Sequence, residues 1–298
     1  MCKGAELSPR CTRDPERVTV MTSAQVRITI LVDNQVTEGL AAEHGFSLWI
    51  EIGDKRILFD TGQGGVLSAN ARALGIDLGK TDILGLSHGH YDHTGGVAQV
   101  LAHGRNINVY CHPGVVLPRY SIRNGIATPI QMPPESMAAL DMLPSKQLHW
   151  VLKPVMLGEK IGLTGHVPRE TTFEDAGGPF FLDRTRKRTD PIVDDQALWI
   201  GMDDGVIVCV GCSHAGLVNT LSYIQHLNPG LRIRAVIGGF HLVNADHERL
   251  DQTLAALRPF ELEMMVPCHC TGQPAVALLR EGLGQRVIPG AAGMTYQF

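Results

Sequence analysis

Four side chains that commonly bind metal ions stand close together, directly after an apolar run. They are His88, His90, Asp92 and His93, in the segment His88-Gly-His-Tyr-Asp-His93. Side chains of an extended segment alternate between two sides, so His88 and His90 can reach the same ion. Asp92 and His93 are adjacent and diverge, so they can serve a second position. Because imidazole and carboxylate together suit Zn²⁺, Fe or Mn²⁺, the segment predicts a metal site.

Three more histidines follow apolar, strand-like runs at turns that contain glycine or proline. His214 lies in Gly211-Cys-Ser-His214, His269 in Pro267-Cys-His269, and His166 directly after Gly165. All of them are candidates to converge on ions held by the first segment. The sequence leaves open whether His166 or His214 supplies the third imidazole.

The segment from His88 to His93 resembles the signature motif of the metallo-β-lactamase superfamily. Upstream, Leu58-Phe-Asp60-Thr-Gly62 is similar to the first motif of that superfamily. Residues 211–216, 238–242 and 267–272 resemble the subgroup that contains dihydropterin ribofuranosylaminobenzene phosphate synthase. The similarity runs from about residue 26 to the C-terminus.

This resemblance implies a four-layer αββα sandwich of the α/β class, with two divalent metal ions at one edge of the sheets. Zn is the first choice of metal, with Fe and Mn as alternatives. Asp60 is expected to support the metal-binding loop through hydrogen bonds. The expected ligands are His88, His90 and His214 for one ion, and Asp92, His93 and His269 for the other.

Further candidates surround this ligand set. Members of the superfamily often carry a bridging Asp where this sequence has Cys212, so Cys212 is a candidate ligand. Asp92 and His241 are the candidate catalytic residues: Asp92 orients a water molecule, and His241 protonates a leaving group. Arg169 is suited to bind a phosphate or carboxylate through two hydrogen bonds. His44, in a loop between two predicted strands, is a candidate substrate contact.

The leading hypothesis is an enzyme with two metal ions that acts on a small anionic substrate through a metal-activated water, because bound metal lowers the pKa of water toward about 7. The subgroup resemblance implies a dihydropterin synthase-like reaction. One alternative is a hydrolase of a phosphodiester, thioester or lactone. Another is a di-iron redox or sensor protein in which Cys212, Cys268 and Cys270 report oxidation. A binding module with a decayed site is disfavoured because the signature from His88 to His93 is complete.

Composition narrows the choice of partners and compartment. A net charge of −4 and a pI near 6.3 give no reason to expect nucleic acid or an anionic membrane as partner. An odd number of cysteines, 7, fits reduced thiols in a cytoplasmic protein better than a disulfide framework. A zinc ribbon built on Cys209 is disfavoured, since Cys209 lies inside an apolar run. The sequence leaves open whether the protein forms a homo-oligomer.

The elements that position these side chains are predicted from periodicity. Strands are expected at 26–33, 46–52, 56–60, 83–86, 107–111, 161–164, 194–201, 205–210, 233–237 and 264–266, and helices at 67–74, 97–102, 217–227, 246–257 and 275–283. Periodicity weakens between about residues 112 and 191, which predicts an insertion that builds the substrate pocket or an oligomer contact. We expect one domain over residues 25–298, preceded by a disordered extension over residues 1–24.

Overall fold

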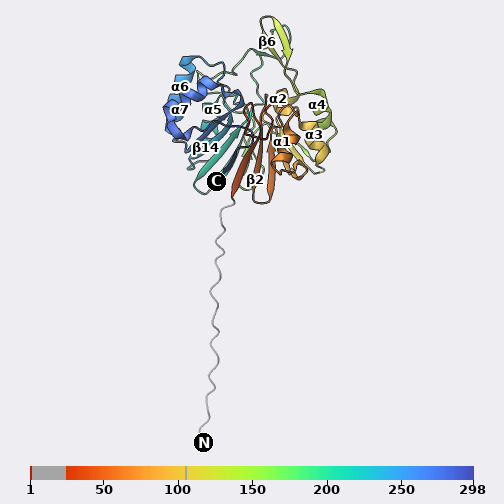
Figure 1. The fold of residues 1–298 in the computed structure, drawn as a ribbon, viewed down its shortest axis with the longest axis vertical. Coiled ribbons are helices and arrows are strands. Elements are labelled where there is room, and N and C mark those ends of the chain that lie inside the picture. Colours follow the sequence, from red (N-terminus) through yellow and green to blue (C-terminus); the bar gives the residue numbers. More distant parts are fainter. Residues whose placement is uncertain (2–24, 105) are drawn as a thin grey trace.

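Two β-sheets lie face to face at the centre of the molecule, and helices cover both outer surfaces (Figure 1). The computed structural model describes residue 1, residues 25–104 and residues 106–298. The predicted disordered extension, apart from residue 1, lies outside the described residues. The arrangement is the four-layer αββα sandwich that the family resemblance implies.

The first sheet has seven strands in the order β16-β1-β2-β3-β4-β5-β8. The strands from β16 to β3 pair antiparallel, and those from β3 to β8 pair parallel. Their bounds are β1 Val26–Val32, β2 Ser47–Ile52, β3 Lys55–Phe59, β4 Ile83–Gly85, β5 Asn108–Cys111, β8 Leu148–Trp150 and β16 Thr295–Gln297. Helices α1 (Leu67–Ala73), α3 (Val97–His103) and α4 (Pro134–Asp141) pack on its outer face through one apolar cluster.

The second sheet has six strands in the order β15-β14-β13-β12-β10-β9. Three of these strands, β13, β14 and β15, run parallel to one another, so their C-terminal ends meet at one edge. The bounds are β9 Val155–Met156, β10 Ile161–Leu163, β12 Ala197–Met202, β13 Gly205–Val210, β14 Ile233–Gly239 and β15 Met264–Cys268.

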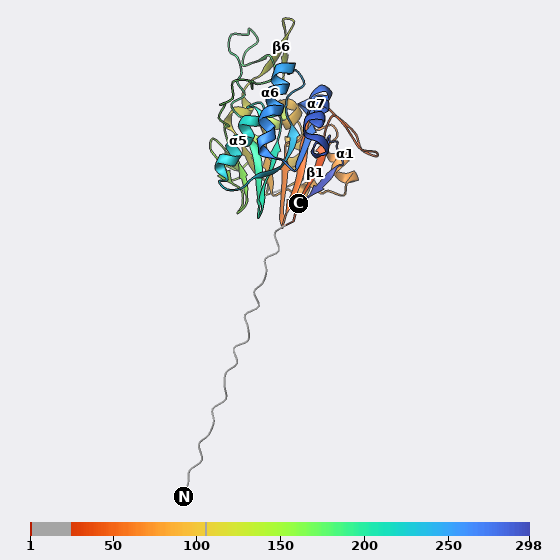
Figure 2. The same cartoon turned by 90° about the vertical axis from the view of Figure 1, so that its left-hand side faces the viewer.

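Helices α5 (Leu217–Leu227), α6 (His247–Leu257) and α7 (Gln273–Leu283) cover the outer face of the second sheet (Figure 2). Each has 11 residues and turns one apolar side to the strands. In the part of the chain that the structure describes, no helix combines the length and apolar character needed to cross a lipid bilayer. The short helical segments are α2 Tyr91–Thr94, η1 Leu78–Lys80, η2 Pro113–Val116, η3 Arg258–Phe260, η4 His269–Thr271 and η5 Gly284–Arg286.

Strand β13 shows why the apolar runs of the sequence become central strands. Ile207 and Cys209 point into the core between the two sheets, whereas Val206 and Val208 point to the outer helices. Successive side chains of a strand leave on opposite sides, and both sides of β13 are buried. A continuous apolar run is the pattern expected of such a strand.

The segment between residues 112 and 191 contributes to all three sheets. It supplies β8 to the first sheet, β9 and β10 to the second, and α4 to an outer layer. It also forms a small third sheet of β6 (Tyr120–Arg123), β7 (Ile126–Pro129) and β11 (Phe180–Phe181), in the order β11-β6-β7. The β6 hairpin stands beyond the ends of the large sheets in both views (Figures 1 and 2).

Candidate metal centre and active site

Loops that follow strands of both large sheets bring the candidate ligands to one edge of the sandwich. The segment from His88 to His93 follows β4 of the first sheet, and Cys212 and His214 follow β13 of the second. His241 and His269 come after β14 and β15, the parallel neighbours of β13. Ser213, His241 and His269 have φ values of 53°, 45° and 47°. Such left-handed backbone is costly for non-glycine residues and concentrates at functional sites.

His88, His90 and His214 form the first group of candidate ligands. One ring nitrogen of each lies within 4.8 Å of those of the other two, and all three side chains are buried. The Nε2 atoms of His90 and His214 have no hydrogen-bond partner among the described residues. Burial holds the pKa of each imidazole well below its ordinary value. Neutral imidazoles with unpaired nitrogens are the form that binds a metal ion, so these residues fit one.

Asp92 is the centre of a second group. Its Oδ2 lies 3.0 Å from Nε2 of His44 and 3.3 Å from Nε2 of His269. Burial alone would raise the pKa of Asp92, but hydrogen bonds from His269 and His44 hold it well below its ordinary value. The sequence predicted Asp92 and His269 as ligands of one ion and His44 as a substrate contact; the structure brings all three together.

Cys212 lies between the histidines of the two groups. Its Sγ is 3.1 Å from Nε2 of His93 and 3.2 Å from Sγ of Cys270. It shares candidate metal groups with three pairs of residues: His88 and His93, His214 and His241, and His269 and Cys270. A thiolate here suits soft or borderline cations. His93, which we expected beside Asp92, has Cys212 as the hydrogen-bond partner of its Nε2.

Asp60 supports the metal loop, as expected. Its carboxylate accepts hydrogen bonds from the backbone N–H of Ser87 at 2.7 Å and from the Ser87 hydroxyl at 2.6 Å. It also lies 2.7 Å from Nδ1 of His93, and both side chains are fully buried. Burial lowers the pKa of His93, but the Asp60 carboxylate outweighs it and raises that pKa to about 9. Asp60 therefore fixes the ring orientation of His93.

A buried ion-pair network that sequence reasoning missed also supports this loop. Asp194 accepts a hydrogen bond from the backbone N–H of Gly89 at 2.8 Å. Arg119, which is fully buried, pairs with Asp194 and with Asp190. A side chain on Gly89 would collide with the backbone oxygen of Val115 at 2.1 Å, so the glycine permits this close approach. No local pattern marks Arg119, because its partners lie far along the chain.

Asp33 and Asn34 hold His269 through hydrogen bonds. The backbone N–H of His269 donates to Oδ1 of Asp33 at 2.6 Å, and its Nδ1 lies 2.8 Å from Oδ1 of Asn34. Burial raises the pKa of Asp33 to about 6. The polar run after the first strand, which sequence reasoning took only as a strand end, could have signalled this role.

Arg169 and His166 differ from the other candidates. The Arg169 guanidinium donates to the backbone oxygens of His214 at 2.6 Å and Pro191 at 2.5 Å. The guanidinium N–H groups, which we expected to bind an anion, therefore hold the loop of His214 in place. His166 is exposed, its Nδ1 lies 3.0 Å from the Val193 oxygen, and it joins none of the metal groups found among the described residues. The structure therefore brings His214, and not His166, to His88 and His90.

Phe180 and His241 line one side of the centre. The Phe180 ring lies 5.3 Å from that of His90, 5.5 Å from His214 and 5.9 Å from His241, measured between centroids. His241 lies 4.2 Å from His214, and its buried Nδ1 has no partner among the described residues. The third sheet, which carries Phe180, thus contributes a wall of the site.

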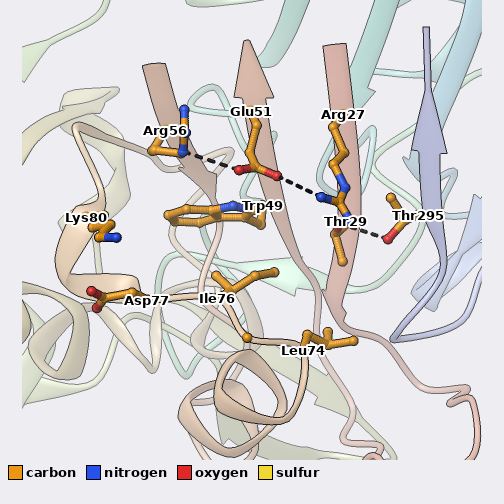
Figure 3. A pocket seen from close by; sticks show the side chains of 11 residues that line it. Arg27, Thr29, Trp49, Glu51, Arg56, Leu74, Ile76, Asp77, Lys80 and Thr295 are labelled. Carbon is orange, nitrogen blue, oxygen red and sulfur yellow. Dashed lines mark hydrogen bonds and ion pairs between the residues drawn. The ribbon is translucent and has the colours of Figure 1, made fainter. Parts of the chain in front are cut away.

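A separate pocket of about 250 Å³ lies on the outer side of the first sheet (Figure 3). Trp49 lies within it, and Arg27 and Arg56 both reach Glu51 across its rim. Its lining includes none of the candidate ligands. We therefore place the candidate active site at the histidine cluster.

Fold and site together define a class, the metal-dependent αββα proteins. The sequence model of the metallo-beta-lactamase superfamily matches residues 41–222, which is more than half of the chain. The chain therefore belongs to this superfamily.

Similar proteins narrow the relationship. The 7,8-dihydropterin-6-methyl-4-(beta-D-ribofuranosyl)-aminobenzene-5'-phosphate synthase of Methanocaldococcus jannaschii is 30% identical over 258 residues, which cover 80% of this chain and 85% of that protein. Uncharacterized protein MJ0448 of the same organism is 33% identical over 256 residues, 85% of this chain and 94% of that one. The crystal structure of Tm1679, described as a metal-dependent hydrolase of the beta-lactamase superfamily, is 29% identical with a TM-score of 0.76, covering 91% of this chain and 98% of that one.

Proposed function

We propose that this protein is an enzyme with two divalent metal ions, most readily Zn, that acts on a small anionic substrate bearing a phosphate or carboxylate. The observation that carries this proposal is the group of His88, His90 and His214, which presents three buried imidazoles, with an unpaired Nε2 on His90 and on His214. Asp92, on the same loop as His88 and His90, is the centre of a second group that also contains His44 and His269. Superfamily membership supports a metal-dependent enzyme.

We assign the first ion to His88, His90 and His214. Asp92 and His269 would hold the second, with His93 and the Cys212 thiolate available between the two positions. Divalent ions in these positions supply Lewis acidity, which lowers the pKa of water toward about 7 and polarises the oxygen under attack.

The protein groups around these positions have separate tasks. Asp92 is held by two imidazoles and stays ionised, so it can accept a hydrogen bond from water and orient it. His241 has a buried ring nitrogen without a described partner, which suits it to deliver a proton to a leaving group. Phe180 excludes water from the side of His90 and His214. His44, half of whose side chain is exposed, is the group that we assign to the substrate.

Two reactions fit this arrangement. The synthase of M. jannaschii supports the joining of a dihydropterin to a ribosylaminobenzene phosphate. Tm1679 supports hydrolysis, and phosphodiesters, thioesters and lactones are the substrate classes to examine. Both reactions make use of the same metal centre, so they are distinguished by assay.

The test compares both reactions in zinc-loaded protein, with His241→Ala and His166→Ala as a matched pair. The synthase would be supported if the wild type makes product from the pterin pair, His241→Ala lowers that rate by about 10²-fold or more, and His166→Ala leaves it unchanged. Turnover of a phosphodiester, thioester or lactone with the same response would support the hydrolase. A fully loaded protein that turns over none of these substrates would contradict the proposal.

A further inference from the structure

Two cysteines from different strand-end loops meet inside the candidate active site. The Sγ atoms of Cys212, after β13, and Cys270, after β15, are 3.2 Å apart. Both side chains are buried, with 2% and 7% of their surface exposed. The other described cysteines are Cys111, Cys209 and Cys268; Cys209 packs in the core between the sheets, and the Cys268 thiol donates to the Val266 oxygen.

We propose that Cys212 and Cys270 form a site of reversible oxidation, in which a peroxide converts the two thiols into a disulfide. A disulfide needs its sulfur atoms about 2.05 Å apart, so the pair has to close by only about 1 Å. The two residues are 58 positions apart in the chain and lie in loops that the parallel strands β13, β14 and β15 hold side by side.

The chemistry balances with one molecule of peroxide. The Cys270 thiol loses its proton, and the thiolate attacks one oxygen of hydrogen peroxide. The O–O bond breaks, Cys270 becomes a sulfenic acid, and the hydroxide that leaves takes up the released proton as the first water. The Cys212 sulfur then attacks the Cys270 sulfur, the S–O bond breaks, and the thiol proton leaves with the hydroxyl group as water. Two thiols are thus oxidised by two electrons, and the peroxide is reduced to two molecules of water. A small dithiol reverses the step by thiol–disulfide exchange.

Exposure favours Cys270 as the attacking sulfur. It is the more accessible of the two, with 7% of its surface exposed against 2% for Cys212, so a peroxide reaches it first. The Sγ of Cys212 lies in contact behind it, 3.2 Å away. Cys212 is therefore the thiol that resolves the sulfenic acid.

Oxidation would change the metal centre because Cys212 is shared among its donors. The thiolate is the form of cysteine that binds metal, and a disulfide sulfur carries no charge. Closing the bond also replaces the Cys212 thiol, now 3.1 Å from Nε2 of His93, by an uncharged disulfide sulfur. Metal binding would weaken by about tenfold or more, comparable to the loss of a residue that supports a ligand. This effect on metal rests on the proposed function, whereas formation of the disulfide does not.

The experiment treats the reduced full-length chain with hydrogen peroxide, both loaded with zinc and stripped by a chelator. Free thiols are alkylated, and peptides are mapped by mass spectrometry with and without a reducing agent. Zinc content is measured on the same samples. Cys270→Ser lacks the attacking thiol, and Cys209→Ala is the matched control because it removes a buried thiol away from the pair.

We expect a cross-linked peptide of Cys212 and Cys270 in the wild type and in Cys209→Ala, reversed by dithiothreitol, and none in Cys270→Ser. Zinc content should fall on oxidation and recover on reduction. The proposed site would be overturned if the two thiols remain alkylatable after peroxide in both the zinc-loaded and the stripped protein, or if they are oxidised to sulfinic acid without a cross-link. A cross-link that leaves zinc content unchanged would overturn its effect on the metal. Lack of catalytic turnover would bear on the proposed function and not on the cross-link.

Discussion

Asp194 holds the backbone N–H of Gly89 at 2.8 Å, although the two residues are 105 positions apart in the chain. Gly89 separates His88 from His90, so a carboxylate from the second half of the chain sets the turn between two candidate ligands. Arg119 neutralises that carboxylate in the interior. The geometry of the metal loop therefore depends on a buried ion pair that contributes no ligand.

Replacing Arg119 with Met should destabilise the fold by about 3–5 kcal/mol, because Asp190 and Asp194 would remain buried without a counter-charge. Denaturation by urea measures this cost. Lys160→Met is the control: Lys160 pairs with Asp203 on the surface, with 53% and 67% of the side chains exposed, and its loss should cost less than about 1 kcal/mol. Equal costs for the two variants would refute the role given to Arg119.

His90→Ala should lose most of the bound metal while it keeps the fold, because the variant removes one of three buried imidazoles from the first group. Elemental analysis after dialysis gives the metal content, and circular dichroism reports the fold. His166→Ala should match the wild type, since His166 is exposed and lies outside this group. Full metal content in His90→Ala would contradict the assigned ligand set.

His112 should make the stability of the protein depend on pH. Burial lowers its pKa below 6.5, and its Nδ1 accepts a hydrogen bond from the Gly114 N–H at 2.9 Å. On acidification the unfolded chain therefore binds a proton on His112 before the folded protein does, and stability is lost as the pH falls through and below 6.5.

The check compares urea midpoints at about pH 7.5 and about pH 5.5, which bracket histidine titration. His112→Asn keeps an acceptor for the Gly114 N–H and does not titrate. The loss of stability on acidification should be smaller in His112→Asn than in the wild type. An identical loss in both proteins would remove His112 from the explanation.

Gly177 offers a test of how His241 is positioned. Its φ is +83°, and a side chain there would lie 2.0 Å from Cδ2 of His241. Gly177→Ala should displace the His241 ring and lower turnover with little effect on metal content. Gly53→Ala is a control with comparable backbone strain, since Gly53 has φ +57° and open space around it. Turnover reduced alike by both substitutions would show that strain alone accounts for the loss.

The strands of the two large sheets and the helices on their outer faces could be predicted, because burial of one or both sides makes apolar residues recur at a regular spacing. The apolar run of β13 and the helical spacing of α5, predicted over 217–227 and found there, are examples. β16 was missed: the last expected strand was 264–266, but Thr295–Gln297 also forms a strand and pairs with β1. This strand has three residues, and its existence depends on a partner at the other end of the chain.

The candidate site could be predicted only as far as neighbouring residues encode it. The spacing of His88 and His90 was sufficient to propose a metal site. The strand-end turns before His214 and His269 made them further candidates, and the family resemblance gave each an expected ion. Arg119 could not be found this way, because a lone arginine in a weakly patterned segment looks like a surface residue until Asp194 is placed beside it. The same reason explains Arg169, whose hydrogen-bonding groups are engaged by backbone oxygens that only the fold brings near.

His88 and His90 follow a strand of one sheet and His214 follows a strand of the other. An ion bound by all three would cross-link the two halves of the sandwich at the edge where they would otherwise separate. Because such an ion binds the folded chain and not the unfolded one, each tenfold rise in its free concentration above the dissociation constant adds about 1.4 kcal/mol of stability. The melting temperature of a preparation would then serve as a measure of its metal occupancy, even where no substrate is at hand.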